Sequence, residues 1–297
     1  MSKAVVYELA AALPVHMGNA VTGEAPYWDE RRRTLWWIDI EGQRLLGFEP
    51  GTGRTRDHRL PLMPGLIAGS ASGGLLLGLE DGLYAFDPAT GLGGRQVAVE
   101  ADNPSSRLND GKPDAKGRLW FGSMDKSGRG APVGTLYCRD LDGSVRVQRS
   151  GVHVPNSIAF SPDGRTLYFA DSRTKKVECC DYDCETGRPG SWREFVAYAD
   201  GESPDGACTD AAGGVWIAVI GGGRIERRLP DGSLSLIVHL PVSRPTMPML
   251  GGPDGKTLFV TSQRCNLSGV QLAQQPLAGH LLAVRVDIPA APVNLVP

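Results

Sequence analysis

The chain of 297 residues is 41% hydrophobic and 22% charged, proportions that allow a sizeable core without cross-links and exclude extensive disorder. Its formal net charge of −2 shows no excess of basic residues, which argues against nucleic acid or an anionic membrane as the main partner. No stretch has the apolar length of a membrane span and the N-terminus lacks a cleavable leader pattern, so we expect a cytoplasmic protein.

Short runs of β-branched, aromatic and leucine residues recur along the chain, separated by Gly, Asp and Pro. The six clearest runs cover residues 34–39, 74–78, 118–122, 166–171, 214–218 and 257–261. When the runs are anchored on their first aliphatic residue, successive separations are 40, 44, 48, 48 and 43 residues. These spacings are close to the length of a four-stranded propeller blade.

Turn sequences on both sides of these runs predict the remaining strands of each blade. A second apolar stretch ending in an acidic or Gly-rich turn follows most runs, and turns before four of them indicate an additional inner strand. Residues 5–9 are left over and are candidates to complete the last blade and close the ring. Because no linker interrupts the pattern, we predict one all-β domain over residues 1–297, a six-bladed β-propeller with four-stranded blades.

The start of each predicted inner strand, ten or eleven residues before the anchor, carries the candidate functional residues. In chain order these positions are Glu24, Gly65, Asn109, Asn156, Asp205 and either Met247 or Pro248. Asn or Asp beside Gly is also an ordinary turn former. Turn formation, however, does not explain why side-chain oxygens occupy the same position of the repeat in four blades. In a propeller, equivalent positions of the inner strands converge on the central axis. Two carboxylates and two amides would form a hard oxygen site for one divalent cation.

Other site types have little support in the sequence. The five histidines fall at different phases of the repeat, and there is no Gly-x-Ser-x-Gly element or phosphate-binding glycine loop. Cys179, Cys180 and Cys184 cluster without a histidine nearby, so we interpret them as reduced structural thiols.

Four short motifs give the chain a family resemblance along nearly its whole length. They are Gly23-Glu24-Ala25-Pro26, Arg107-Leu108-Asn109-Asp110-Gly111, Pro155-Asn156-Ser157 and Ser203-Pro204-Asp205-Gly206. With these motifs the sequence resembles the SMP-30/gluconolactonase/regucalcin family of six-bladed propellers. The resemblance implies that Glu24, Asn156 and Asp205 bind the metal, that Arg107 and Asn109 contact substrate, and that Asp205 doubles as general base.

The stretch from Arg244 to Gly279 is similar to the bacterial aldonolactonases of that family. This similarity implies a small sugar lactone as substrate, such as xylono-, arabinono-, galactono- or gluconolactone. The cation would be Ca²⁺, Zn²⁺, Mn²⁺, Mg²⁺ or Fe²⁺. The chain departs from many relatives at Ala25 and Ser157, which replace Gly, and in the loop from Asp125 to Val133, where some relatives place an acidic substrate contact.

We therefore expect metal-dependent hydrolysis of a sugar lactone by a monomer or weak homo-oligomer. The cation would polarise the lactone carbonyl while Asp205 takes a proton from the attacking water. An equal alternative is attack by a hydroxide held by the cation, with Asp205 as proton relay. Two rival functions remain: a related propeller esterase or phosphotriesterase, and a non-catalytic metal-binding regulatory propeller.

Overall fold

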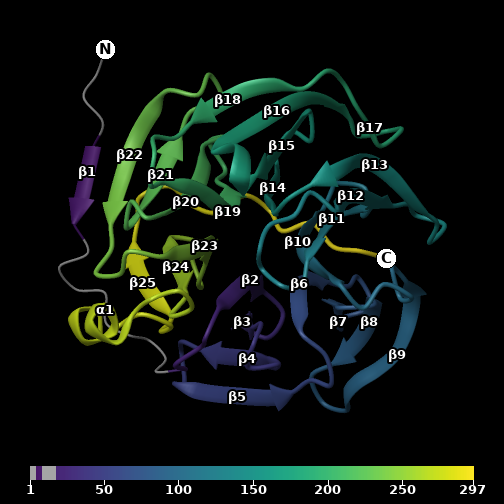
Figure 1. Cartoon of the computed structure of the whole chain (residues 1–297), viewed down its shortest axis with the longest axis horizontal. Helices are drawn as coiled ribbons and strands as arrows, with labels where there is room; N and C mark the ends of the chain where they lie inside the picture. The colour runs from purple at the N-terminus through teal and green to yellow at the C-terminus, as the bar shows by residue number, and fades with distance from the viewer. Residues whose placement is uncertain (1–4, 9–17) are drawn as a thin grey trace.

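The computed structural model describes residues 5–8 and 18–297. Within these residues the strands form six sheets arranged as blades around a central axis (Figure 1). This arrangement confirms the predicted all-β, six-bladed propeller built on a four-stranded plan. In each blade the first strand lies nearest the axis, and the next strands follow it outward as antiparallel neighbours.

The first three blades each contain four consecutive strands. Blade 1 consists of β2 (Gly23–Asp29), β3 (Thr34–Asp39), β4 (Arg44–Glu49) and β5 (Arg54–Arg59). Blade 2 consists of β6 (Pro64–Gly69), β7 (Leu75–Leu79), β8 (Gly82–Asp87) and β9 (Gly91–Ala98). Blade 3 consists of β10 (Ser106–Pro113), β11 (Leu119–Asp125), β12 (Gly134–Arg139) and β13 (Val145–Val152).

The last three blades vary this plan. Blade 4 has β14 (Pro155–Phe160), β15 (Thr166–Asp171), the 3-10 turn η1 (Ser172–Thr174), β16 (Lys176–Asp183), β17 (Arg188–Pro189) and β18 (Arg193–Ala197). Blade 5 has β19 (Ser203–Thr209), β20 (Val215–Ile220), β21 (Arg224–Arg228) and β22 (Leu234–His239). Blade 6 has β23 (Pro245–Gly251), β24 (Thr257–Ser262), helix α1 (Gly269–Gln274) and β25 (Leu282–Arg285).

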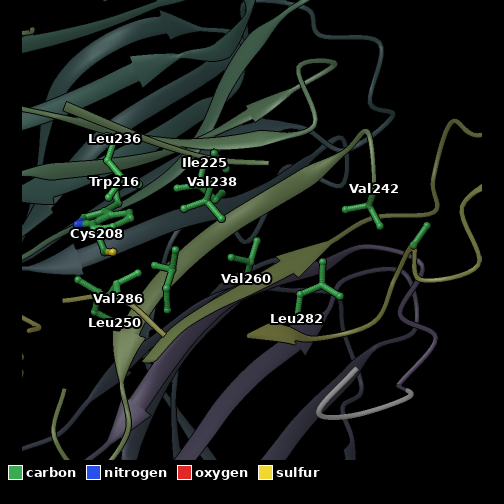
Figure 2. Packing of buried hydrophobic residues seen from close by; sticks show 13 residues of the cluster. Cys208, Trp216, Ile225, Leu236, Val238, Val242, Leu250, Val260, Leu282 and Val286 are labelled. Carbon is green, nitrogen blue, oxygen red and sulfur yellow. The ribbon is translucent and has the colours of Figure 1, made fainter. Parts of the chain in front are cut away.

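The hydrophobic core is divided among the blade interfaces. The second strands, such as β3 and β11, are buried along their whole length because a neighbouring blade covers each face. Buried side chains form six clusters within the described residues, one between each pair of adjacent blades. Figure 2 shows the cluster between blades 5 and 6, with Trp216 on one side and Val260 and Leu282 on the other. This packing holds the inner strands rigidly around the axis.

The N-terminal strand lies in a different blade from the one we expected. Strand β1 (Val5–Glu8) pairs in parallel with β22 at the outer edge of blade 5, and Figure 1 shows the two side by side. The prediction that residues 5–9 complete the last blade is therefore wrong, and Leu9 itself lies outside the described residues. The edge of β22 offers unpaired backbone groups that β1 satisfies. Blades 6 and 1 instead join through backbone hydrogen bonds of residues 20–22 with residues 263–265 and Gly279, and through side-chain packing that includes the stacked rings of Trp28 and Phe259.

Helix α1 is a second feature absent from the sequence prediction. It is short, and a capping box between Ser268 and Gln271 begins it. None of the helices in the described part of the chain has the length and apolar character needed to cross a membrane.

Candidate metal and substrate site

Each inner strand has a β-bulge near the level of the predicted site residues. The pairing register shifts after Glu24 in β2, after Asn109 in β10 and after Asn156 in β14, and equivalent shifts occur in β6, β19 and β23. Bulges turn side chains away from the regular alternation of a strand. Here they offer a common structural reason for aiming side chains from different blades at the axis.

The residue after a site residue adopts a left-handed backbone in three blades. Ala25, Asp110 and Ser157 have φ angles of 47°, 46° and 52°. This conformation costs a residue other than glycine about 1–3 kcal/mol and persists only where the surroundings enforce it. Such strain concentrates at functional sites, which supports the choice of this level of the propeller as the candidate site.

Blades 3 and 4 are joined by a chain of hydrogen bonds through the predicted substrate residues. Arg107 donates through Nη1 to Oδ1 of Asn109 at 2.8 Å. Asn109 donates through Nδ2 to Oδ1 of Asn156 at 3.1 Å and to the carbonyl of Pro155 at 2.8 Å. The structure therefore brings Arg107, Asn109 and Asn156 together.

Blade 4 in turn holds the segment that carries Asp205. Ser157 donates through Oγ to the backbone carbonyl of Asp205. Ser172 accepts from Nδ2 of Asn156 at 2.9 Å and donates to the carbonyl of Pro204 at 2.7 Å. These bonds fix the position of Asp205 relative to Asn156.

Glu24 and Asp205 are buried carboxylates, with 8% and 6% of their surfaces exposed. Burial raises the pKa of Glu24 to about 8; the backbone N–H of Ala25 opposes this rise and the charge of Asp110 adds to it. Burial also raises the pKa of Asp205 well above its usual value, and repulsion from Glu24 and Asp110 raises it further. The carboxylates thus lie close enough to oppose one another's ionisation.

These residues fit a divalent cation. Among the described residues neither Glu24 nor Asp205 has an ion-pair partner within 4.0 Å, although both are buried. A bound cation would remove their repulsion and the cost of burying their charge. Together with the amide oxygen of Asn156 they would form a donor set of oxygens only, the kind that Ca²⁺ and Mg²⁺ prefer. The described part of the chain has no group of three or more His, Cys, Asp or Glu suited to a metal, and this set contains only two such residues beside the amide.

Asp110 is a site-adjacent residue that the sequence analysis did not single out. Its carboxylate accepts from the backbone N–H of Ile158 at 3.0 Å and of Gly111 at 2.7 Å, which ties blade 3 to blade 4. Burial raises the pKa of Asp110. The Asn-Asp-Gly motif contained the signal, but only Asn109 lies ten residues before the anchor Leu119.

Asp125, in the loop that departs from many relatives, has a local structural role. Its carboxylate accepts from the backbone N–H of Ser127 at 2.9 Å and from its hydroxyl at 2.6 Å. It therefore caps the turn that begins the loop after β11.

Comparison with known proteins agrees with this fold. The chain belongs to the SMP-30/gluconolactonase/LRE-like family, whose model matches residues 22–264. It is 37% identical to a 6-deoxy-6-sulfogluconolactonase of Pseudomonas putida, over 91% of this chain and 93% of that protein. It is also 37% identical to an L-arabinolactonase of Azospirillum brasilense, over 89% of this chain and 88% of that one.

A solved relative shares the whole architecture. The crystal structure of a calcium-binding protein, regucalcin, from Agrobacterium tumefaciens superposes with a TM-score of 0.94 at 30% identity. The match covers 99% of this chain and 100% of that chain. The propeller and its central axis are therefore common to both proteins.

Proposed function

We propose that this protein hydrolyses a sugar lactone to the open-chain acid with one divalent cation held by Glu24, Asn156 and Asp205. The observation that supports the proposal most is the presence, at the beginnings of the inner strands, of two buried carboxylates without ion-pair partners and of the hydrogen-bonded group Arg107, Asn109 and Asn156. Sugar lactonases among the relatives support the substrate class.

When bound, the cation would supply Lewis-acid chemistry, polarising the lactone carbonyl. Asp205 takes a proton from the attacking water as the water oxygen bonds to the carbonyl carbon. The bond between that carbon and the ring oxygen then breaks, and the ring oxygen receives the proton that Asp205 took from the water. Arg107 and Asn109 orient the sugar, since their donors lie beside Asn156 and are fixed by neighbouring backbone groups.

A non-catalytic metal-binding propeller is the second candidate, because the structurally similar regucalcin is described as calcium-binding. Binding of a cation alone does not account for the polar group of Arg107 and Asn109 next to the carboxylates. A propeller esterase or phosphotriesterase would share the cation but favour a more apolar pocket. Cytoplasmic localisation and a monomeric or weakly associated state stay predictions of the sequence.

The test uses purified protein stripped of metal and assayed by pH-stat on several aldonolactones and one aryl ester. We expect no lactone hydrolysis without metal, and recovery to different extents with Ca²⁺, Mn²⁺, Zn²⁺ or Fe²⁺. Full activity of thoroughly metal-free protein would contradict the proposal, and faster hydrolysis of the aryl ester would favour the esterase. The Glu24→Gln variant is expected to keep its fold but to bind the cation more weakly.

A further inference from the structure

Two long loops lie on the face of the propeller that carries the candidate site. The inner strands begin on this face, and each connection from the second to the third strand of a blade returns to it. Within the described residues four of these connections are short, at residues 40–43, 80–81, 172–175 and 221–223. The other two, residues 126–133 and 263–281, belong to blades 3 and 6, which lie across the ring from one another (Figure 1). Long loops on a rigid scaffold commonly carry specificity.

Arg244 is locked to the beginning of the loop in blade 6. It directly precedes β23, and its Nη2 and Nε donate to the side-chain oxygen of Gln263 at 2.7 and 2.8 Å, with the amide oxygen turned toward the guanidinium. The backbone N–H of Gln263 also donates to the carbonyl of Arg244 at 3.1 Å. No hydrogen-bond partner for Nη1 occurs in the described part of the chain, so one edge of the guanidinium is held and the other can receive a ligand.

Arg244 lies two residues before Thr246, whose hydroxyl donates to the carbonyl of Gly23, the residue before Glu24. Burial raises the pKa of Asp205, and the charges of Arg244 and Arg107 oppose this rise. Burial and the charge of Glu41 raise the pKa of the Cys265 thiol, whereas Arg244 and Arg107 again oppose the rise. Arg244 and Arg107 therefore reach the same region from blades 6 and 3.

Both guanidiniums are bound by neutral oxygens. Arg107 donates to Asn109 and to the carbonyl of Leu108, and Arg244 donates to an amide. By contrast, Arg224 and Arg227 in blade 5 each pair with a carboxylate, at 2.7 Å and 2.6 Å. A half-buried guanidinium held by a neutral group keeps its full charge for an anionic ligand.

The nearby carboxylates do not cancel the positive charge of these two guanidiniums once the site holds its divalent cation. Glu24 and Asp205 would be neutralised by the cation, and Glu80 is paired with Lys126. Glu41 is exposed to solvent, which screens its charge.

We propose that Arg244 is a specificity residue that binds an anionic substituent of the lactone, on the side of the axis opposite Arg107. The preferred substrate would then be a sugar lactone with a carboxylate, sulfonate or phosphate group distant from the ring carbonyl. This inference rests on the proposed function and narrows its substrate class. Gln263 acts as a positioning residue, since it orients the guanidinium.

The test compares matched neutral and charged lactones with metal-loaded enzyme. One pair is D-glucono-1,4-lactone and D-glucaro-1,4-lactone, which differ in a carboxylate; the other is D-glucono-1,5-lactone and its 6-phosphate. We expect wild type to have the higher kcat/KM for the charged member of at least one pair. Arg244→Gln should lower that value about 10- to 100-fold and the neutral value by less than about 3-fold, as expected for a lost charge-assisted hydrogen bond.

Arg264→Gln is the matched control, because it removes an arginine of the same loop whose side chain lies beside Gly279. It should change neither substrate by more than about 3-fold. Equal losses on both members in Arg244→Gln, or a wild-type preference for the neutral member of both pairs, would overturn the proposal. If Arg244→Gln does not fold, Arg244→Lys replaces it: retained preference for the charged member supports the proposal, and equal losses on both members contradict it.

A binding measurement separates this inference from the proposed function. Thermal shifts of metal-loaded protein are measured with D-gluconate and D-glucarate, which need no turnover. If no lactone is hydrolysed, the proposed function fails, yet stronger stabilisation by glucarate that is lost in Arg244→Gln still supports the anion site. Equal stabilisation by the two acids would refute the anion site whether or not the enzyme is active.

Discussion

Glu24 and Asp205 are the residues at which burial and charge conflict most directly. Burial raises the pKa of both carboxyl groups, and the charge of Glu24 raises the pKa of Asp205 further. Such pairs are costly unless a cation or a proton neutralises them. The same competition between cation and proton makes their behaviour depend on pH.

The Asp205→Asn variant tests the double role of this residue. The change keeps size and one oxygen donor but removes the charge and most of the basicity. We expect kcat on an aldonolactone to fall by about 10²–10⁴-fold, the range typical of a lost general base, and saturating metal should not restore it. Asp163→Asn, at an exposed turn within blade 4, should behave like wild type. Recovery of wild-type kcat at high metal would show that Asp205 is only a ligand.

The metal-free protein should lose stability as pH rises from about 4.5 to about 8. Burial raises the pKa of Glu24 from 4.5 to about 8, so in this window the folded state holds a proton that the unfolded state has released. The stabilisation is complete below the lower value and is lost as pH rises through the upper one. Metal affinity should rise over the same window, because the cation displaces that proton.

The measurement is a series of thermal melts in chelator between pH 5 and pH 8, for wild type and Glu24→Gln. The difference between the two isolates Glu24 from other titrating groups. An unchanged pH slope in Glu24→Gln would show that Glu24 does not carry the effect.

At the scale of elements, the last residue of a second strand holds the segment that leads into the site. Asp171 ends β15, and its carboxylate accepts from the backbone N–H of His153 at 2.9 Å and of Val154 at 3.1 Å, just before Asn156. Asp39 ends β3 and accepts in the same way from Val21 at 3.0 Å, shortly before Glu24. Both aspartates end strands with similar sequences. The sequence pattern did not predict their role as hydrogen-bond acceptors, because the backbone donors come from another part of the blade.

Asp171→Ala should destabilise the protein by about 1–3 kcal/mol, because it leaves backbone donors without partners. It should also weaken cation binding, since the position of Asn156 depends on this segment. Asp163→Ala is the control, as it caps a turn between β14 and β15 without touching the segment before Asn156. Calorimetry and metal titration measure the two effects. Unchanged metal affinity in Asp171→Ala would mean that β14 is held by its neighbours alone.

At the scale of the whole molecule, the C-terminal segment ties several blades together at the ends of their inner strands opposite the site. Residues 286–297 run from blade 6 across the ring, as the yellow trace in Figure 1 shows. Ala211 in blade 5 donates to the carbonyl of Pro289, and Asn294 donates to the carbonyl of Pro113 at 3.1 Å in blade 3. Val296 donates to Gly69 at 2.9 Å in blade 2. The segment therefore works as a strap across the ring.

Deleting residues 289–297 should lower Tm by about 5–10 °C, through loss of these bonds and of the burial of Val296. Because the site lies at the other end of the inner strands, kcat below the melting range should stay within about 2-fold of wild type. Differential scanning calorimetry and steady-state kinetics check both parts. A large loss of kcat with unchanged Tm would show that the strap acts on the site.

The number of blades and the phase of the oxygen donors follow from the sequence alone. Both depend on short-range patterns, because each blade repeats the same order of turns and buried strands. Glu24, Asn109, Asn156 and Asp205 occupy equivalent positions in this repeat and therefore lie at a similar height along the axis. Helix α1 had a local signal in Ser268 and Gln271, but it spans too few residues for a helical period to stand out.

The tertiary structure alone decided the features that depend on contacts between distant segments. The pairing of β1 with β22 was set by an open strand edge, to which no local pattern points. The same applies to Asp110 with Ile158 and to Arg244 with Gln263, whose partners come from different strands or blades. A short-range pattern reports which way a side chain faces within its own strand, whereas its partner and the charge it meets depend on how the blades close into a ring.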